Sequence, residues 1–286
     1  MNVLNKKRLS RSVGGDILIF LFLAALGLCM VLPMVYAVSS SLKPLDELWI
    51  FPPRFFPANP TMENFSDLFL VMSNASIPFS RYVFNTILIA VLGTIGHVIL
   101  SSMCAYPLAK HRFKGSKIIF SVIEMSLMFT TAVTAIPTFL IISKLGWIDS
   151  YAALIVPAFS SSLGLYLMKQ FMDTNVNDSV LEAARIDGCG ELVIFWKIVM
   201  PSVKPAWLTL IIFSFQGLWS IGGNVYIYSE HLKTLNYAIT QIVSGGLARA
   251  GVGAAATVIM AIPPILVFLF SQSNVVETMA TSGMKD

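Results

Sequence analysis

Side chains that catalyse reactions or bind metals are scarce and scattered in this sequence. The three histidines and three cysteines are His97, His111, His231, Cys29, Cys104 and Cys189. Their spacing fits neither a disulfide framework nor a zinc site. The phosphate-binding pattern G-x-x-x-x-G-K-[ST] is absent, as are H-E-x-x-H and G-x-S-x-G. We therefore predict that the chain is not an enzyme and binds no ATP, cofactor or metal itself.

A polar segment over residues 173–204 has the pattern of a docking surface instead. Ser179 followed by Glu182 predicts a capping box at the start of a short helix. Ala183 and Ala184 are strong helix formers that leave a smooth surface for close approach. Gly188 stands where the end of a helix needs left-handed backbone geometry.

A second short helix is predicted from Glu191 to about Val199, ended by Pro201. Its apolar residues Leu192 and Phe195 lie on one face with Val199. Two short helices joined at a glycine can pack one apolar face on the rest of the protein. The other face is then available to a groove of a partner protein.

A polar stripe is predicted farther along, where Gln216, Ser220 and Asn224 lie four residues apart beside Trp219. On a helix these side chains share one face. Polar groups at membrane depth either line a watery path or hydrogen-bond to neighbouring helices, and both interpretations stay open.

One carboxylate, Glu124, falls well inside an apolar stretch. It lies only two turns past Lys117, so we favour a structural role near the membrane surface, by pairing or by reaching water.

The elements that position these residues are apolar. The chain is 56% hydrophobic and 12% charged, with a mean hydropathy of +0.77, whereas soluble domains carry about 25% charged residues. Six stretches are long enough to cross a bilayer. They run over about 17–39, 82–107, 118–142, 151–172, 206–226 and 254–275. We predict an all-α polytopic membrane protein, with one permease-like domain over 1–286 and a long first outer loop over about 40–81.

Lysines and arginines outside these stretches indicate the orientation. They are concentrated in the N-terminal tail, in the loop after the second stretch (Lys110 to Lys117) and in the 173–204 segment. Such residues favour the cytoplasmic side, so both termini are predicted to be cytoplasmic. No basic run with interleaved aromatics is present, which argues against a nucleic-acid partner.

The 173–204 segment resembles the signature of ATP-binding-cassette (ABC) importer permeases. That signature reads Glu-Ala-Ala, three residues, Gly, nine residues, Ile, one residue, Leu-Pro. The chain has Glu182-Ala183-Ala184, Gly188, Ile198 and then Met200-Pro201, so only the leucine differs. The 41–44 and 146–157 segments more loosely resemble carbohydrate permeases of the smaller maltose-permease subunit type.

This resemblance implies a role and partners. It implies six transmembrane helices with a cytoplasmic coupling helix between the fourth and fifth, formed by the residues just named. It also implies a second homologous permease, two ATPase subunits that hold ATP and Mg²⁺, and an extracellular solute-binding protein. The implied cargo is a sugar or oligosaccharide. A permease for peptide or phosphate, and a non-transporting scaffold or sensor, remain the alternatives.

Overall fold

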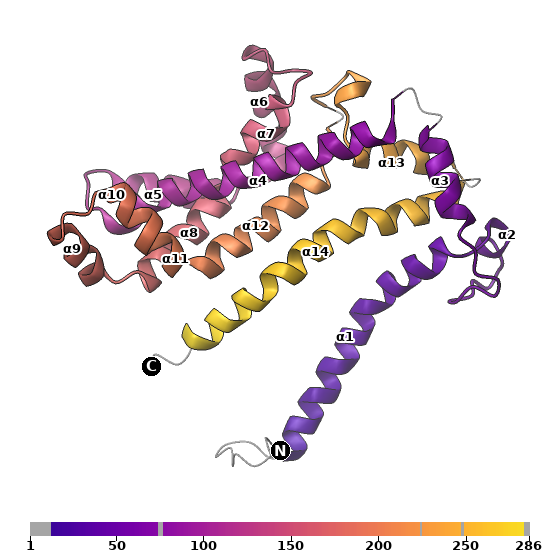
Figure 1. Cartoon of the computed structure of the whole chain (residues 1–286), viewed down its shortest axis with the longest axis horizontal. Coiled ribbons are helices and arrows are strands. Elements are labelled where there is room, and N and C mark those ends of the chain that lie inside the picture. Colours follow the sequence, from indigo (N-terminus) through magenta and orange to yellow (C-terminus); the bar gives the residue numbers. More distant parts are fainter. Residues whose placement is uncertain (1–12, 74–76, 224, 247–248, 283–286) are drawn as a thin grey trace. The chain divides into compact units, whose positions relative to one another are not determined.

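The computed structural model describes residues 13–73, 77–223, 225–246 and 249–282, and within these ranges the chain is helical without strands. Figure 1 shows the elements in chain order. The helices are α1 (Val13–Ser41), α2 (Leu45–Leu48), α3 (Glu63–Ser73), α4 (Phe79–Lys110), α5 (Ser116–Ser126), α6 (Thr131–Lys144), α7 (Ala152–Phe159), α8 (Ser162–Asn175), α9 (Asp178–Ile186), α10 (Glu191–Ile194), α11 (Met200–Ser202), α12 (Lys204–Trp219), α13 (Leu235–Val243) and α14 (Ala250–Ser282). A π-helical turn (Phe195–Val199) and a 3₁₀ turn (Glu230–Leu232) complete them.

Four to six segments are long and apolar enough to cross a membrane. Four are helical over Gly14–Ser41, Phe79–Lys110, Ala152–Asn175 and Ala250–Gln272. Two further candidates are pairs of helices separated by a bend. The chain bends by 111° between α5 and α6, and by 81° between Glu191–Ser202 and α12. The predicted all-helical membrane architecture is confirmed at this level.

Three of the six predicted stretches, the third, the fourth and the fifth, are less regular than expected. The third, over 118–142, is broken because Thr130 is extended and begins a new helix. Threonine is β-branched and competes for backbone hydrogen bonds, so it favours such a break. The fifth, over 206–226, is helical only to Trp219, and Gly223 beyond it has a φ of +71° that a helix cannot accommodate.

The chain forms two compact units, of which the smaller comprises 1–68 and 245–258. Its loop after α1 is fastened by buried polar groups. Lys43 donates to the carbonyl of Arg54, and Glu47 accepts from the amides of Ala58 and Asn59 at 2.9 and 3.0 Å. The side-chain amide of Asn64 donates to the carbonyls of Ser41 and Lys43. Charged groups this deeply buried persist only when they are bonded in this way. The prediction of a single permease domain stays a prediction.

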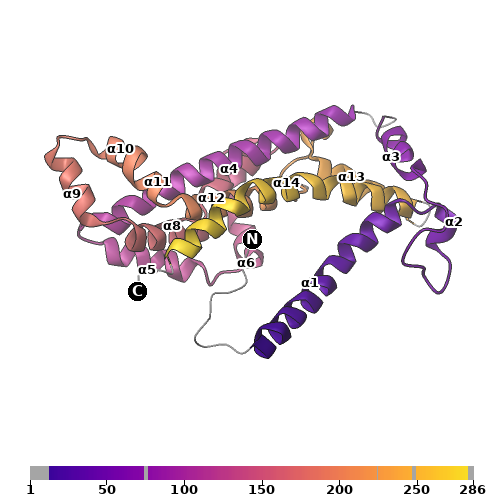
Figure 2. The same cartoon turned by 60° about the horizontal axis from the view of Figure 1, so that its bottom comes forward.

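In the larger unit, residues 69–244 and 259–286, α4 is the central helix. The helices α12, α8, α7 and α13 all pack against it, and Figures 1 and 2 show α8 and α12 running beside it. Glycines permit the close approach: a Cβ on Gly93 would meet Leu218 at 2.5 Å, and one on Gly96 would meet Phe159 at 2.0 Å. Small residues allow such close packing between helices in membranes, where the hydrophobic effect does not drive helices together.

The predicted fourth stretch is also discontinuous. The helix α7 stops at Phe159, two residues after Pro157, and α8 begins at Ser162. Ser161 caps α8 by accepting from the amide of Gly164 at 3.3 Å. This break lies beside the middle of α4.

A carboxylate joins two loops of the larger unit. Asp149 accepts from the amides of Tyr228 and Ser229, at 2.9 and 2.8 Å, and from the Ser229 hydroxyl. These hydrogen bonds, that from the Ser229 side chain foremost, lower the pKa of the Asp149 carboxyl. The loop after α6 is thereby fixed to the loop after α12.

Candidate coupling surface and translocation path

The helix α9 begins two residues earlier than the capping box predicts. Asn177 is its N-cap, and its side-chain oxygen accepts from the amide of Ser179 at 3.3 Å. Asparagine serves this role as well as serine does. Ser179 is therefore already inside the first turn. Glu182 is exposed and makes no hydrogen bond or ion pair within the described residues, so the predicted reciprocal cap is wrong.

The end of α9 follows the prediction. Gly188 has a φ of +80°, the left-handed geometry that glycine adopts without steric cost. The amide of Cys189 donates to the Ala184 carbonyl, and that of Gly188 to Arg185, both at 3.0 Å. This pair of bonds is a Schellman motif, which gives hydrogen-bond partners to carbonyls at the end of the helix that would otherwise have none. It sets a sharp turn before α10.

The next helix differs from its prediction. From Glu191 it runs as α10, a π-helical turn and α11, and ends at Ser202 rather than at Pro201. A π turn shifts the backbone pairing, so Pro201 can stay in helical geometry although it donates no hydrogen bond. The chain then bends at Val203 and enters α12.

The two faces of this loop have different roles. Its inner face is buried with α4, α8 and α12 through Leu181, Ala184, Ile194, Phe195 and Val199, with Ile198 half-buried beside them. The outer face exposes Glu182 and Ala183, with Ile186 at 86% exposed and Leu192 at 67%. Ala184 and Leu192 thus differ from the prediction: Ala184 packs inward, whereas Leu192 is exposed although Phe195 and Val199 are buried.

A polar network binds the loop to the end of α4. Glu191 accepts from the Tyr106 hydroxyl and from Arg185 Nε, both at 2.7 Å. Lys110 pairs with Asp178 at 2.8 Å, which lowers the pKa of the Asp178 carboxyl. Sequence reasoning missed these pairs because residues far apart in the chain form them. The only local signal is the six-residue spacing of Arg185 and Glu191.

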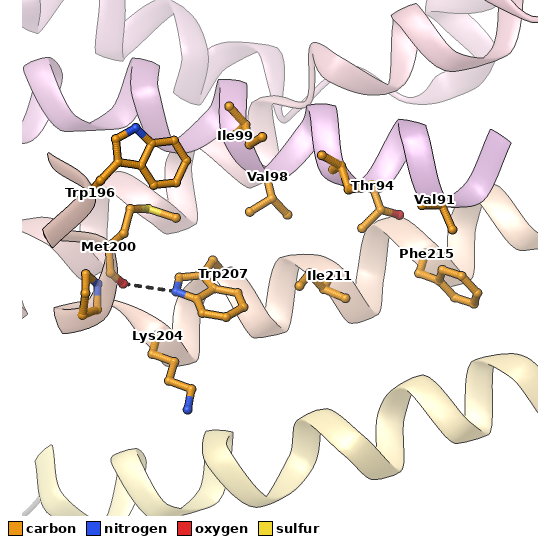
Figure 3. A pocket seen from close by; sticks show the side chains of 12 residues that line it. Val91, Thr94, Val98, Ile99, Trp196, Met200, Lys204, Trp207, Ile211 and Phe215 are labelled. Atoms are coloured by element: carbon orange, nitrogen blue, oxygen red, sulfur yellow. Dashed lines mark hydrogen bonds between the residues drawn. The ribbon is translucent and has the colours of Figure 1, made fainter. Parts of the chain in front are cut away.

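A pocket of about 680 Å³ opens between α4 and the start of α12 (Figure 3). Its walls are apolar, and Trp196 and Trp207 stand at one end. The Trp207 indole donates to the Met200 carbonyl at 3.1 Å. Lys204 is among the described residues that line it.

The predicted polar stripe is only partly formed. Ser220 follows the last residue of α12, so the stripe does not continue along one helix. Gln216 is exposed, whereas Trp219 is buried, stacks on Phe215 and donates to the Met260 carbonyl at 3.0 Å. Asn224 lies outside the described residues.

Glu124 lies near the C-terminal end of α5, exposed on the surface of the chain. Within the described part of the chain it makes no ion pair, so the pairing that the sequence suggested is not formed there.

Comparison with known proteins places these features in context. The family described as "Binding-protein-dependent transport system inner membrane component" matches residues 97–281. The arabinooligosaccharides transport system permease protein AraQ of Bacillus subtilis is 28% identical, over 93% of this chain and 94% of that protein. The sn-glycerol-3-phosphate transport system permease protein UgpE of Yersinia enterocolitica is 31% identical, over 80% and 83%.

A solved structure shares the fold. It is a chain of a bacterial ABC transporter involved in the import of the acidic polysaccharide alginate, with a TM-score of 0.76 and 24% identity over 93% of this chain and 99% of that one.

Proposed function

The chain belongs to the family of binding-protein-dependent transport system inner membrane components, and from that premise we propose that it is the permease subunit of an ABC importer for a sugar or oligosaccharide. The sugar assignment is supported by relatives named for arabinooligosaccharides and for alginate. The relative named for sn-glycerol-3-phosphate supports a second candidate, a phosphorylated polyol.

The observation that carries the proposal is the two-faced loop after α8. Its inner face is anchored in the core and its outer face, with Glu182, Ala183 and Ile186, is exposed. We assign α9 as the coupling helix, which docks in a groove of an ATPase subunit. Ala183 allows close contact, and Ile186 supplies apolar area for burial against the partner. Gly188, Ile198 and Pro201 shape and anchor the loop behind it.

The proposed assembly contains this chain, a second homologous permease, two ATPase subunits and an external solute-binding protein. ATP and Mg²⁺ bind to the ATPase subunits. This chain crosses the bilayer six times with the two bent pairs each counted as one span, and both termini are cytoplasmic. The predicted path residues Gln216, Ser220 and Asn224 remain candidates for the path at the end of α12.

In this proposal, transport depends on the contacts that connect α9 to the membrane helices. Closure of the ATPase subunits on ATP displaces α9. The Glu191 network and the Lys110–Asp178 pair tie α9 and α10 to the end of α4. Since α4 packs on α7, α8 and α12, displacement of α9 moves the helices of the larger unit together, which changes access to the path.

Replacing Ala183 with tryptophan tests this assignment. The position is exposed, so the protein should fold, but the bulky side chain blocks close docking on a preformed groove. We expect Ala183→Trp to lose most of the ATPase that co-purifies with the wild-type chain from mild detergent, as measured by mass spectrometry.

The matched control is Ala58→Trp, the same change at an exposed alanine in the first outer loop. It should retain the ATPase fully. Equal recovery with both variants would refute the coupling role of α9. A wild-type chain that recovers neither an ATPase nor a second permease would support the scaffold or sensor interpretation instead.

A further inference from the structure

A second cavity, of about 680 Å³, lies on another side of α4 and is used by none of the roles above. It is enclosed by α4, by the break between α7 and α8, and by the bent pair α5 and α6. Its volume is in the range of small-molecule sites. The break between α7 and α8 borders it, and irregular backbone at membrane depth is tolerated where it lines a cavity or is buried in protein.

Five residues with hydroxyl groups line this cavity. They belong to Ser101, Thr138, Ser160, Ser161 and Ser162. The three consecutive serines at the break are held in place: Ser161 caps α8, and Ser162 bonds to Ser126 at 2.6 Å. Each hydroxyl has one donor and two acceptor positions, so these bonds leave capacity for a ligand.

Two buried polar atoms beside the break have no hydrogen-bond partner among the described residues. They are Oγ of Ser101, which is 3% exposed, and Nε2 of His97, which is 8% exposed. A Cβ on Gly164 would lie 2.2 Å from that Nε2 and 2.9 Å from that Oγ, so the two atoms are neighbours. An unsatisfied buried polar group costs about 1–3 kcal/mol, which a bound ligand or water would remove.

The charge of the side chains that line the cavity limits the charge of the ligand it can bind. Among the described residues that line it, none is charged. A phosphate or carboxylate would therefore be desolvated without a counter-charge, which is costly. The aromatic side chains of Phe159 and Trp147 also line the cavity, and an aromatic ring can pack against the C–H groups of a sugar ring.

We propose that this cavity is a binding site for a neutral sugar ring, which rests on the proposed sugar-permease function and narrows its cargo to uncharged saccharides. Ser101 and the serines at the α7–α8 break bind the ring hydroxyls.

Cys104 provides a native reporter because it lines the cavity and is exposed. The full chain, expressed with its partners in membrane vesicles, carries Cys29→Ala and Cys189→Ala so that Cys104 is the only thiol. We measure its rate of modification by a hydrophilic methanethiosulfonate and by N-ethylmaleimide. Cys104→Ala gives the background.

The hydrophilic reagent should react, because a site that takes up a sugar must be accessible from water. Maltotriose or arabinotriose should slow the reaction, by about twofold when the saccharide concentration equals its Kd. Digalacturonate and glycerol 3-phosphate should not. Ser101→Ala should weaken protection by about two- to tenfold, the effect of one hydrogen bond, whereas Ser202→Ala, at an exposed serine on α11, should leave it unchanged.

Three results would overturn the proposal: reaction with N-ethylmaleimide alone, which indicates a lipid-filled cavity; protection by the anionic compounds only; or no protection by any saccharide. If an ATPase still co-purifies in those cases, the sugar site is refuted while the permease function stands. If no ATPase is recovered, the proposed function itself fails.

Discussion

At the scale of single residues, the lack of a side chain at Gly164 determines what α4 can present to α8. His97 and Ser101 both project into the space that a Cβ would occupy. Sequence alone shows only a glycine near the start of a helix, where it has no evident purpose. In the structure this glycine admits two polar side chains between tightly packed helices.

We expect Gly164→Ala to lower stability by about 1–3 kcal/mol, because a methyl group 2.2 Å from His97 Nε2 forces the ring to move. Thermal unfolding of the detergent-solubilised protein measures the change. Gly217→Ala is the control: that glycine lies in α12 with nothing within 4 Å, so its melting temperature should stay the same or rise slightly. Equal melting temperatures for the two variants would contradict the packing argument.

At the scale of elements, α9 and α10 are held in their orientation by polar contacts as well as by their buried face. Glu191 is the shared acceptor, since it bonds to Tyr106 of α4 and to Arg185 of α9. The loop is thus attached both by its buried face and by this carboxylate. Such double attachment suits an element that must transmit displacement without deforming.

Glu191→Gln should loosen the loop while leaving the bundle folded. The neutral amide loses the charge-assisted bonds, a loss of about 1 kcal/mol at a half-exposed site, which corresponds to roughly fivefold faster amide exchange. Hydrogen exchange over residues 178–202 measures it. The same change at Glu182, which has no partner within the described residues, should leave exchange unchanged, and acceleration by both variants would argue against the network.

At the scale of the whole molecule, the charge distribution assigns the sides of the membrane. The loop over 173–204 and the basic loop after α4 lie at one end of the larger unit, linked by the Lys110–Asp178 pair. The positive-inside rule predicts that this end is cytoplasmic. The sequence prediction puts the proline- and aromatic-rich segment after α1 outside the cell.

A native thiol tests that orientation. Cys189, in the turn after α9, is exposed and should react with a membrane-impermeant maleimide only after the cells are permeabilised. Introduced alone into a background without other cysteines, Ala58→Cys should react in intact cells. The reverse pattern would invert the topology and remove α9 from contact with a cytoplasmic ATPase.

The sequence by itself determined the class of the protein. Apolar stretches of bilayer length require helices, because backbone groups in lipid must be satisfied within the chain. The left-handed turn at Gly188 was equally predictable, since glycine adopts that geometry without strain. Fixed spacing from Glu182 to Pro201 identified the loop and its resemblance to importer permeases.

Only the tertiary structure decided which residues meet. Ala184 looks equivalent to Ala183 in the sequence, yet one is buried and the other exposed, because burial depends on the neighbours of the helix. The Tyr106–Glu191 bond and the Ser101–His97–Gly164 cluster join segments separated by tens of residues. Local propensity and periodicity carry no information on such pairs; the close packing of α4 against α8 and the coupling loop brings them together.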